Sequence, residues 1–329
     1  MPSAPDRQNL CPPSCIRKCP SIHFSPTYSL TMPPLLAAIE AGGTKFVCTV
    51  GTGPDDLREI VRIPTTDPQS TLAAVTAHLQ HCQQVHGSIA AIGVGTFGPA
   101  GVTLGTSDYG KITTTPKTGW QDTDVLGHLR QSFDVPMAFD TDVNAAALSE
   151  FRWGAGQGSD SVLYLTIGTG IGGGFCWDGK LLHGLLHPEM GHIRLPHDLV
   201  RDPFHGGCPW HGDCLEGLAS GSAIEKRWQT KAENLKPDHP AWELEAHYLG
   251  AACADFLCMF SPQKIVMGGG VMDVPGLIEK VRIAAAIQLA DYLRHPEIQA
   301  GLGTVIVPPG LGSHSGLCGA LALAMGVCR

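Results

Sequence analysis

The sequence is poor in charge, in clustered cations and in long apolar runs. Only 16% of its 329 residues are charged, the net charge is −8, and no run of five Lys or Arg residues occurs. Nucleic-acid affinity comes largely from clustered cations, so a surface that binds a phosphate backbone is disfavoured. No apolar run approaches the length that spans a bilayer. With 43% hydrophobic residues, the chain can bury a large core, and its length suits two domains or one bilobal unit.

The N-terminal stretch lacks the continuous apolar segment of a signal peptide, which argues against secretion. It carries cysteines at four-residue spacing, which could indicate a metal site. We favour an unstructured extension over residues 1–34, or a true start at Met32. Twelve cysteines in the chain are too few for a disulfide scaffold, and many, such as Cys48 and Cys258, lie singly in apolar stretches. They are typical of reduced core residues in a cytoplasmic protein.

Apolar runs separated by glycine-rich breaks predict alternating strands and helices. Residues 35–62 predict three consecutive strands, the first two joined by a Gly-Gly turn, and a helix follows at 70–86. The second half repeats this pattern in SVLYLTIGTG and GIGGGFCWDG, followed by helices at about 248–260 and 276–294. We therefore expect an α/β fold of two similar halves with a ligand cleft between them.

Two glycine-rich turns, one in each half, have the design of a phosphate site. Gly42 and Gly43 let backbone N–H groups approach an anion, while Thr44 adds a hydroxyl and Lys45 a positive charge. Alone, this turn fits an ordinary hairpin equally well. The second turn is neither a Walker loop, since no Gly-Lys-Ser/Thr follows, nor a dinucleotide fingerprint, since a strand follows. The pair predicts a phosphate chain held between the halves; the second turn contains Gly168, Thr169 and Gly170.

A third glycine run contains Gly269 and Gly270, at a strand end before a helix, where a nucleotide could lie against bare backbone.

The segment FDTDVN joins an apolar strand to a helix and carries two aspartates. A carboxylate at the carboxyl end of a strand faces the cleft of an α/β fold. Phosphoryl transfer to a hydroxyl needs a carboxylate that orients the hydroxyl and accepts its proton. Asp140 could simply cap the helix or pair locally. Asp142 is therefore the predicted base.

The strongest signal is a loop with cysteine and histidine at metal-ligand spacing. Cys208, His211 and Cys214 lie three residues apart in GCPWHGDC, which is rich in Gly and has no apolar periodicity. Sulfur and imidazole ligands at this spacing predict a structural zinc site with a fourth ligand from elsewhere. Three unrelated polar loop residues are the weaker interpretation. Three nearby histidines could supply the fourth ligand: His192, His197 and His205.

A zinc with four protein ligands has no open position, so it would shape the loop and leave the chemistry to other groups. It could hold Glu189 and Glu216 toward a sugar, because carboxylates accept hydrogen bonds from hydroxyls.

Taken together, the motifs between about Leu35 and Val327 resemble the ROK sugar kinases, and within them the bacterial fructokinase branch. EAGGTKF is similar to that branch's first phosphate motif and FDTDVNAAALSE to its catalytic segment. HPEMGHI with CPWHGDCLEGLASG resembles its sugar and zinc signature, and YGKITTTPKTGW its substrate loop. These ordered motifs cover nearly the whole chain.

The resemblance implies a fold of the actin-like ATPase (ribonuclease H-like) type, with two similar lobes, a central cleft and a zinc-bound loop at 189–216. We expect an N-terminal α/β lobe over 35–143, completed by a C-terminal helix at 315–328, and a C-terminal lobe over 144–314.

The resemblance also implies roles for single residues. Asp142 is the general base, and Glu40 binds magnesium through water. The phosphates are held by Gly42, Gly43, Thr44, Lys45, Gly168, Thr169 and Gly170, and Gly269 and Gly270 lie near the adenosine. The sugar contacts Gly98, Lys117, Thr141, Asp142, Glu189, His192 and Glu216, and zinc is held by His192, Cys208, His211 and Cys214.

Two departures from the broad family pattern favour fructose. His211 among the metal ligands is a fructokinase habit, and Thr141 stands where glucose-type members have an Asn before the catalytic Asp. Lys117 is a candidate for fructose preference, although it could be a solvated loop lysine.

We therefore expect ATP-dependent phosphorylation of a free hexose at its 6-hydroxyl, most simply D-fructose to fructose 6-phosphate. Mg²⁺ accompanies ATP because it neutralises charge on the phosphate oxygens. The expected partners are ATP, a hexose and a second copy in a homodimer, with no nucleic acid and no membrane, in the cytoplasm.

Three other interpretations compete with the fructokinase. A glucose, mannose or N-acetylhexosamine kinase of the same family is the first. A sugar-responsive regulator is the second, but residues 1–34 are too short and proline-broken for a helix-turn-helix. A zinc-binding interaction module is the third, and it leaves the glycine turns unexplained.

Overall fold

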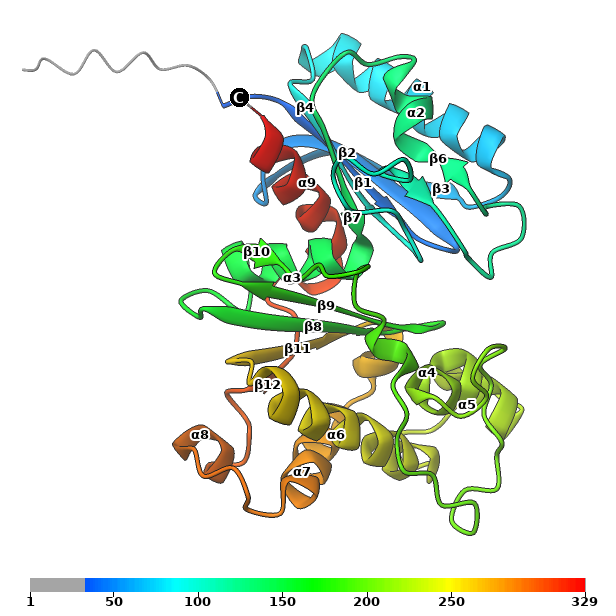
Figure 1. The fold of residues 1–329 in the computed structure, drawn as a ribbon, viewed down its shortest axis with the longest axis vertical. Coiled ribbons are helices and arrows are strands. Elements are labelled where there is room, and N and C mark those ends of the chain that lie inside the picture. The colour runs from blue at the N-terminus through cyan, green and yellow to red at the C-terminus, as the bar shows by residue number, and fades with distance from the viewer. Residues whose placement is uncertain (1–32, 329) are drawn as a thin grey trace, which may run out of the picture. The chain divides into compact units, whose positions relative to one another are not determined.

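Two five-stranded mixed sheets organise the chain, one above the other in Figure 1. The computed structural model describes residues 33–328. The expectations of an unstructured extension, a start at Met32 and an N-terminal metal site lie outside the described residues.

The N-terminal half contains the first sheet and two helices on its outer face. Its strands are β1 (Leu36–Ala41), β2 (Lys45–Gly53), β3 (Asp56–Pro64), β4 (Ala91–Thr96) and β7 (Met137–Thr141), with the short pair β5 (Lys111–Ile112) and β6 (Thr123–Asp124), and its helices are α1 (Pro68–His86) and α2 (Val125–Arg130).

The C-terminal half contains the second sheet and most of the remaining helices. Its strands are β8 (Ser161–Ile167), β9 (Ile171–Trp177), β10 (Lys180–Leu181), β11 (Lys264–Gly268) and β12 (Ile306–Val307), and its helices are α4 (Leu215–Ala219), α5 (Gly221–Trp228), α6 (Ala241–Phe260), α7 (Leu277–Leu289) and α8 (Pro296–Gln299). Two more helices, α3 (Asp142–Trp153) and α9 (Ser315–Val327), lie between the sheets.

The two sheets have the same topology. Their strand orders are β3-β2-β1-β4-β7 and β10-β9-β8-β11-β12. In each sheet the first strand in chain order pairs antiparallel with the second and parallel with the fourth. The expectation of an α/β fold with two similar halves is confirmed.

The core of the N-terminal half follows from strand alternation along β1. Ala37 and Ile39 pack against α1 and α2, whereas Leu36 and Ala38 pack against α9. Successive side chains of a strand point to opposite faces, so an unbroken apolar strand can be buried on both sides. The C-terminal sheet is buried in the same way, between α3 on one face and α6 and α7 on the other.

The two central helices approach each other and the first sheet closely because two positions carry no side chain. A Cβ on Gly319 of α9 would lie 2.1 Å from the carbonyl oxygen of Ala145 in α3. A Cβ on Gly93 of β4 would lie 1.9 Å from the carbonyl oxygen of Ala320. Glycine at both places is therefore a packing requirement.

The predicted lobe boundary at 143/144 stays a prediction.

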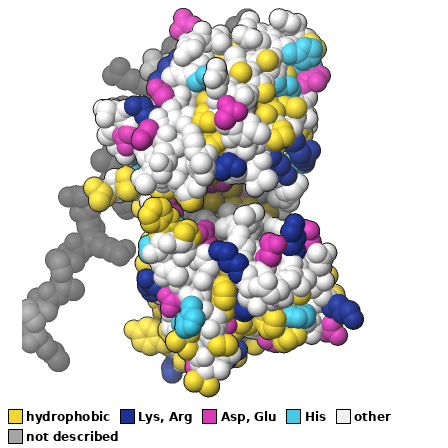
Figure 2. Space-filling view, turned by 90° about the vertical axis from the view of Figure 1, so that its right-hand side faces the viewer, with side chains coloured by type: hydrophobic (Ala, Val, Ile, Leu, Met, Phe, Trp, Pro, Cys, Tyr) yellow, Lys and Arg dark blue, Asp and Glu magenta, His cyan; other side chains and the backbone are white. Residues whose placement is uncertain are grey.

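The surface is hollowed between the upper and lower halves in Figure 2, where the two lobes meet. On this face, Lys and Arg side chains alternate with Asp and Glu side chains and gather into no large patch of one sign. Within residues 33–328, no helix combines the length and the apolar composition that a membrane crossing needs.

Three details differ from the sequence-based expectations. Helix α6 begins at Ala241, directly after Pro240, which is earlier than expected. Its early turns mix charged and buried residues, so the apolar period of these turns is not visible in the sequence. Helix α7 ends at Leu289, since Ala290 turns into the left-handed conformation at φ 47°. Cys258 is exposed, so its interpretation as a core residue was wrong: it lies on the outer face of α6, whereas Cys48 is buried.

Candidate active site and metal centre

Asp142 begins α3 directly after the carboxyl end of β7. Thr141 caps the helix, because its Oγ1 accepts a hydrogen bond from the Asn144 N–H at 3.2 Å. The Asp142 Oδ1 accepts from the Val143 N–H at 2.9 Å. Burial, reinforced by the charge of Glu40, raises the pKa of Asp142 to about 7. A carboxyl that titrates near neutrality can exchange a proton with a substrate hydroxyl.

Glu40 lies on β1, two residues before the first glycine turn, and its charge acts on Asp142. Burial raises the pKa of Glu40, and the charges of Lys45 and Arg62 oppose that shift. A Cβ on Gly316 would lie 2.5 Å from Glu40 Oε1, so the start of α9 leaves room for this carboxylate only as glycine. The charge of Glu40 raises the proton affinity of Asp142, and a divalent cation between two such carboxylates would relieve this repulsion.

Asp140 has a different environment from Asp142. Its Oδ1 accepts hydrogen bonds from the Asn144 side-chain amide and the Thr141 N–H, both at 2.8 Å. Its Oδ2 lies 2.7 Å from His183 Nε2. The hydrogen bond with Asp140 raises the pKa of His183. Asp140 thus pairs locally, one of the two minor roles that we allowed it, and the helix cap falls to Thr141.

The first glycine turn joins β1 to β2 and leaves its backbone open to solvent. The Gly42 N–H donates to the Lys45 carbonyl at 3.0 Å, which closes the turn. Gly43, Thr44 and Lys45 are exposed, and a Cβ on Gly43 would meet no atom within 4 Å. The side-chain and backbone donors of this turn are therefore available to an anion.

The second turn joins β8 to β9 and is held from behind by its neighbours. The Gly168 N–H donates to the Gly170 carbonyl at 2.9 Å, and the Gly221 N–H at the start of α5 donates to the Gly168 carbonyl at 2.7 Å. Thr169 is exposed at the tip.

The third glycine segment follows β11 and lies against the end of β8. Gly269 has φ +90°, and a Cβ there would lie 2.4 Å from the Ile167 carbonyl oxygen. Gly270 is exposed, and a Cβ there would meet no atom within 4 Å. The structure thus brings the second and third segments together in the C-terminal half.

Two glutamates lie beside the second turn. Glu216 Oε2 accepts from the Ile171 N–H at 3.0 Å, and a Cβ on Gly170 would lie 2.5 Å from the same oxygen. Burial, with the charge of Glu216, raises the pKa of Glu189 to about 7. Because the charge of Glu189 also raises the pKa of Asp142, these carboxylates form one acidic cluster around the predicted base.

The remaining two predicted sugar contacts lie on N-terminal loops. Gly98 lies against the ring of His187, since a Cβ there would be 3.3 Å from the His187 Cε1. Lys117 is half-buried, its N–H donates to Thr115 Oγ1 at 3.3 Å, and its ammonium makes no ion pair within residues 33–328. Their roles stay predictions.

Four predicted metal ligands converge: His192, Cys208, His211 and Cys214. The His192 Nδ1 lies 3.3 Å from His211 Nδ1, 3.5 Å from Cys214 Sγ and 3.8 Å from Cys208 Sγ. A tetrahedral zinc with Zn–N near 2.0 Å and Zn–S near 2.3 Å separates its ligand atoms by about 3.3–3.8 Å. The donor set and its spacing therefore fit a closed tetrahedral zinc site.

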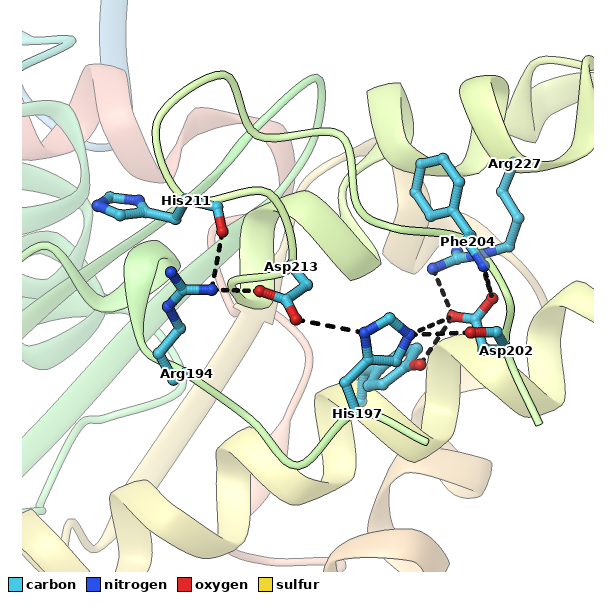
Figure 3. Close-up of polar contacts among 8 residues, drawn as sticks. Arg194, His197, Asp202, Phe204, His211, Asp213 and Arg227 are labelled. Carbon is cyan, nitrogen blue, oxygen red and sulfur yellow. Dashed lines mark hydrogen bonds and ion pairs between the residues drawn. The ribbon is translucent and has the colours of Figure 1, made fainter. Parts of the chain in front are cut away.

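Of the three candidate fourth ligands, His192 lies in the cluster and His197 lies in a separate network. Figure 3 shows His197 between Asp202 and Asp213. Its Nδ1 is 3.4 Å from Asp213 Oδ2, and its Nε2 is 3.0 Å from the Asp202 carbonyl. Sequence spacing could not separate these histidines, since both lie in the same loop.

That network braces the metal loop from outside. Arg194 pairs with Asp213 and donates to the His211 carbonyl at 2.7 Å (Figure 3). On the other side, Arg227 donates two hydrogen bonds to the buried Asp202 carboxylate, at 3.0 and 3.2 Å. Charge-assisted pairs of this kind fix geometry, so the loop is tied to α5 by groups other than the four predicted metal ligands.

The cluster also orients a polar group toward the glutamates. His192 presents Nδ1 to the cluster, and its Nε2 lies 4.0 Å from Glu189 Oε2. A metal on Nδ1 would keep the proton on Nε2, which then faces Glu189.

Known proteins are similar to this chain over most of its length. The ROK family profile matches residues 36–327. The chain belongs to the ROK family. A fructokinase of Zymomonas mobilis is 42% identical over 88% of this chain and 96% of its own, and one of Pediococcus pentosaceus is 41% identical over 90% and 99%. The ROK family glucokinase of Streptomyces griseus, solved with glucose and AMPPNP, has a TM-score of 0.72 at 25% identity, over 89% of this chain and 99% of that one.

Membership of the ROK family confirms the resemblance seen in the motifs, and the solved ROK structure confirms the two-lobed fold. The sequence indicated no role for two histidines near the candidate active site, His183 and His187. Each makes its contact with a residue far away in sequence, so no local spacing could have revealed it.

Proposed function

We propose that this ROK protein is an ATP-dependent fructokinase that transfers the γ-phosphoryl group of ATP to the 6-hydroxyl of D-fructose. The observation that carries the proposal is Asp142, a carboxyl with a pKa near 7 at the start of a helix between two lobes with glycine turns. Fructokinases that are 41–42% identical over nearly their full length support fructose as the substrate.

Asp142 acts as the general base. Its carboxylate accepts the proton of the 6-hydroxyl while the sugar oxygen attacks the γ-phosphorus. The new O–P bond forms, the bond from phosphorus to the β–γ bridging oxygen breaks, and ADP leaves with that electron pair.

The glycine turns bind the phosphates from both lobes. The N-terminal turn supplies backbone N–H groups, the Thr44 hydroxyl and the Lys45 ammonium, and the C-terminal turn supplies the backbone around Thr169. Gly269 and Gly270 leave backbone bare for the adenosine.

The sugar lies between loops of both lobes. Glu189 and Glu216 accept hydrogen bonds from its hydroxyls, and His192 donates one through Nε2. From the other side come Gly98, Thr141 and Lys117.

Glu40 and Asp142 are the carboxylates that would hold Mg²⁺, Glu40 through water. Magnesium supplies charge neutralisation on the β and γ oxygens of ATP. The unfavourable proximity of the two carboxylates supports this role.

His192, Cys208, His211 and Cys214 would hold one zinc ion. With these four protein ligands zinc would have no open position, so it would supply no chemistry to the transfer and would fix the loop that carries Glu189 and Glu216.

The protein forms a homodimer and acts in the cytoplasm. Leu185 and Leu186 are 97% and 57% exposed, and a second copy that covered them would remove apolar surface from water. Cytoplasm provides ATP and keeps the metal-binding thiols reduced.

A panel of free sugars with coupled detection of ADP tests the substrate. With ATP and Mg²⁺, we expect kcat/KM for fructose to exceed those for glucose, mannose and N-acetylglucosamine by at least about tenfold. An isomerase-coupled assay should identify the product as fructose 6-phosphate. A larger kcat/KM for another sugar would replace fructose, and sugar binding without ADP release would indicate a regulator.

A further inference from the structure

A hydrogen bond between loops of the two lobes lies beside the candidate sugar site. The Ala100 N–H, in the loop after β4, donates to His187 Nε2 at 3.0 Å. His187 lies in the loop between β10 and Glu189, so its partners are 87 residues apart in sequence. The His187 side chain is 3% exposed, and the contact is therefore shielded from water.

The donor fixes the state of the ring. Because a backbone N–H can only donate, Nε2 must carry the lone pair and the ring proton must lie on Nδ1. That nitrogen lies 3.3 Å from the Pro188 carbonyl and 3.6 Å from Glu189 Oε1. Burial lowers the pKa of His187, in agreement with a neutral ring.

The ring lies against the N-terminal loop at two further points. A Cβ on Gly98 would lie 3.3 Å from His187 Cε1 and 3.4 Å from Nε2, so the loop approaches the ring face closely. The loop is itself anchored, because Thr113 donates to the Pro99 carbonyl from both its N–H, at 2.8 Å, and its hydroxyl, at 3.0 Å. Thr113 begins the segment that leads to Lys117.

Two segments assigned to the sugar therefore meet at His187, those of Gly98 and Glu189. The segment that leads to Lys117 is bonded to the first of them through Thr113. We propose that His187 is a positioning residue for fructose, which holds the N-terminal loop 98–100 at a fixed distance from Glu189. It does so as a hydrogen-bond acceptor for Ala100. This role rests on the proposed fructokinase activity.

A set of three variants separates the acceptor from the volume of the ring. His187→Leu keeps an apolar side chain of similar size but leaves the buried Ala100 N–H without a partner. We expect KM for fructose to rise about tenfold, equivalent to about 1.4 kcal/mol, while KM for ATP changes less than about twofold. His187→Gln places an amide oxygen near the position of Nε2 and should return KM for fructose to within about threefold of wild type. His187→Ala should resemble His187→Leu.

Each variant is first checked for a wild-type circular dichroism spectrum and zinc content, and fructose affinity is also measured by titration calorimetry. A folded His187→Leu protein with wild-type KM and affinity for fructose overturns the inference. So does a folded His187→Gln protein that is as impaired as His187→Leu. If the wild-type protein itself does not phosphorylate fructose, it is the proposed function that fails.

Discussion

The two lobes share one strand order but carry different insertions. In the N-terminal lobe the chain between the third and fourth strands, β3 and β4, contains only α1, whereas in the C-terminal lobe the equivalent chain between β10 and β11 contains the metal loop and α4 to α6. The glycine turns occupy equivalent places in both halves, between the first two strands. The shared topology thus places a glycine turn at the equivalent position of each lobe, whereas the predicted base follows β7 and the glutamates predicted to bind the sugar lie in the C-terminal insertion.

The largest effect should come from removing the base, which has no counterpart in the C-terminal lobe. Asp142→Asn should lower kcat by about 10²–10⁴-fold with little change in ATP affinity, because only proton acceptance is lost. Steady-state kinetics and nucleotide titration measure the two quantities. Asp160→Asn, at an exposed position, is the matched control. Turnover of Asp142→Asn at the wild-type rate would remove Asp142 from its role.

The metal loop should behave as a stabilising unit that the N-terminal lobe lacks. Cys214→Ser should reduce bound zinc from about one per chain to a small fraction and lower the Tm by about 5 °C or more, because binding of a structural zinc contributes folding free energy. Metal analysis and thermal denaturation measure both. Cys258→Ser, at an exposed cysteine outside the cluster, should change neither. Equal behaviour of the two variants would contradict the metal assignment.

The pH dependence should report the buried carboxyl of the N-terminal half. Burial raises the pKa of Asp142 to about 7, so the free enzyme holds the proton below this pH and the base is inactive there. We expect kcat/KM for fructose to fall about tenfold from pH 8 to pH 6. A profile that is flat over this interval would show that no group with this pKa controls the reaction.

The smallest effect should distinguish the two glycine turns. A Cβ on Gly170 would lie 2.5 Å from Glu216 Oε2, whereas a Cβ on Gly43 would meet no atom within 4 Å. Gly170→Ala should therefore displace Glu216 and raise KM for fructose about fivefold, together with KM for ATP. Gly43→Ala should raise KM for ATP alone. Identical changes in both variants would mean that the turns are equivalent in function as well as in position.

Local patterns were sufficient to predict the strands, the glycine turns and most of the metal site. Cys208, His211 and Cys214 are close in sequence, so their spacing alone indicated that they could bind one metal ion. Local spacing could not choose between His192 and His197, because the choice depends on Asp202 and Asp213 holding His197 away.

Contacts between distant parts of the chain were beyond prediction. His187 lies in a loop without periodicity, and its partner Ala100 contributes only a backbone N–H, which every residue but proline possesses. The exposure of Cys258 was mispredicted for a related reason. An apolar stretch predicts that a helix is buried, but the apolar residues at the end of α6 lie on all of its faces, so the sequence does not show which of them is turned outward.

Helix α9 has a consequence for how the molecule is made. It covers one face of β1 and β4 with Leu317, Ala320 and Leu321, although it follows those strands by more than two hundred positions. During synthesis, one apolar face of the first sheet therefore stays uncovered until residues 315–327 have left the ribosome. All five strands of the first sheet are synthesised by residue 141, but this face can be buried only after the strands of the second sheet have been made as well.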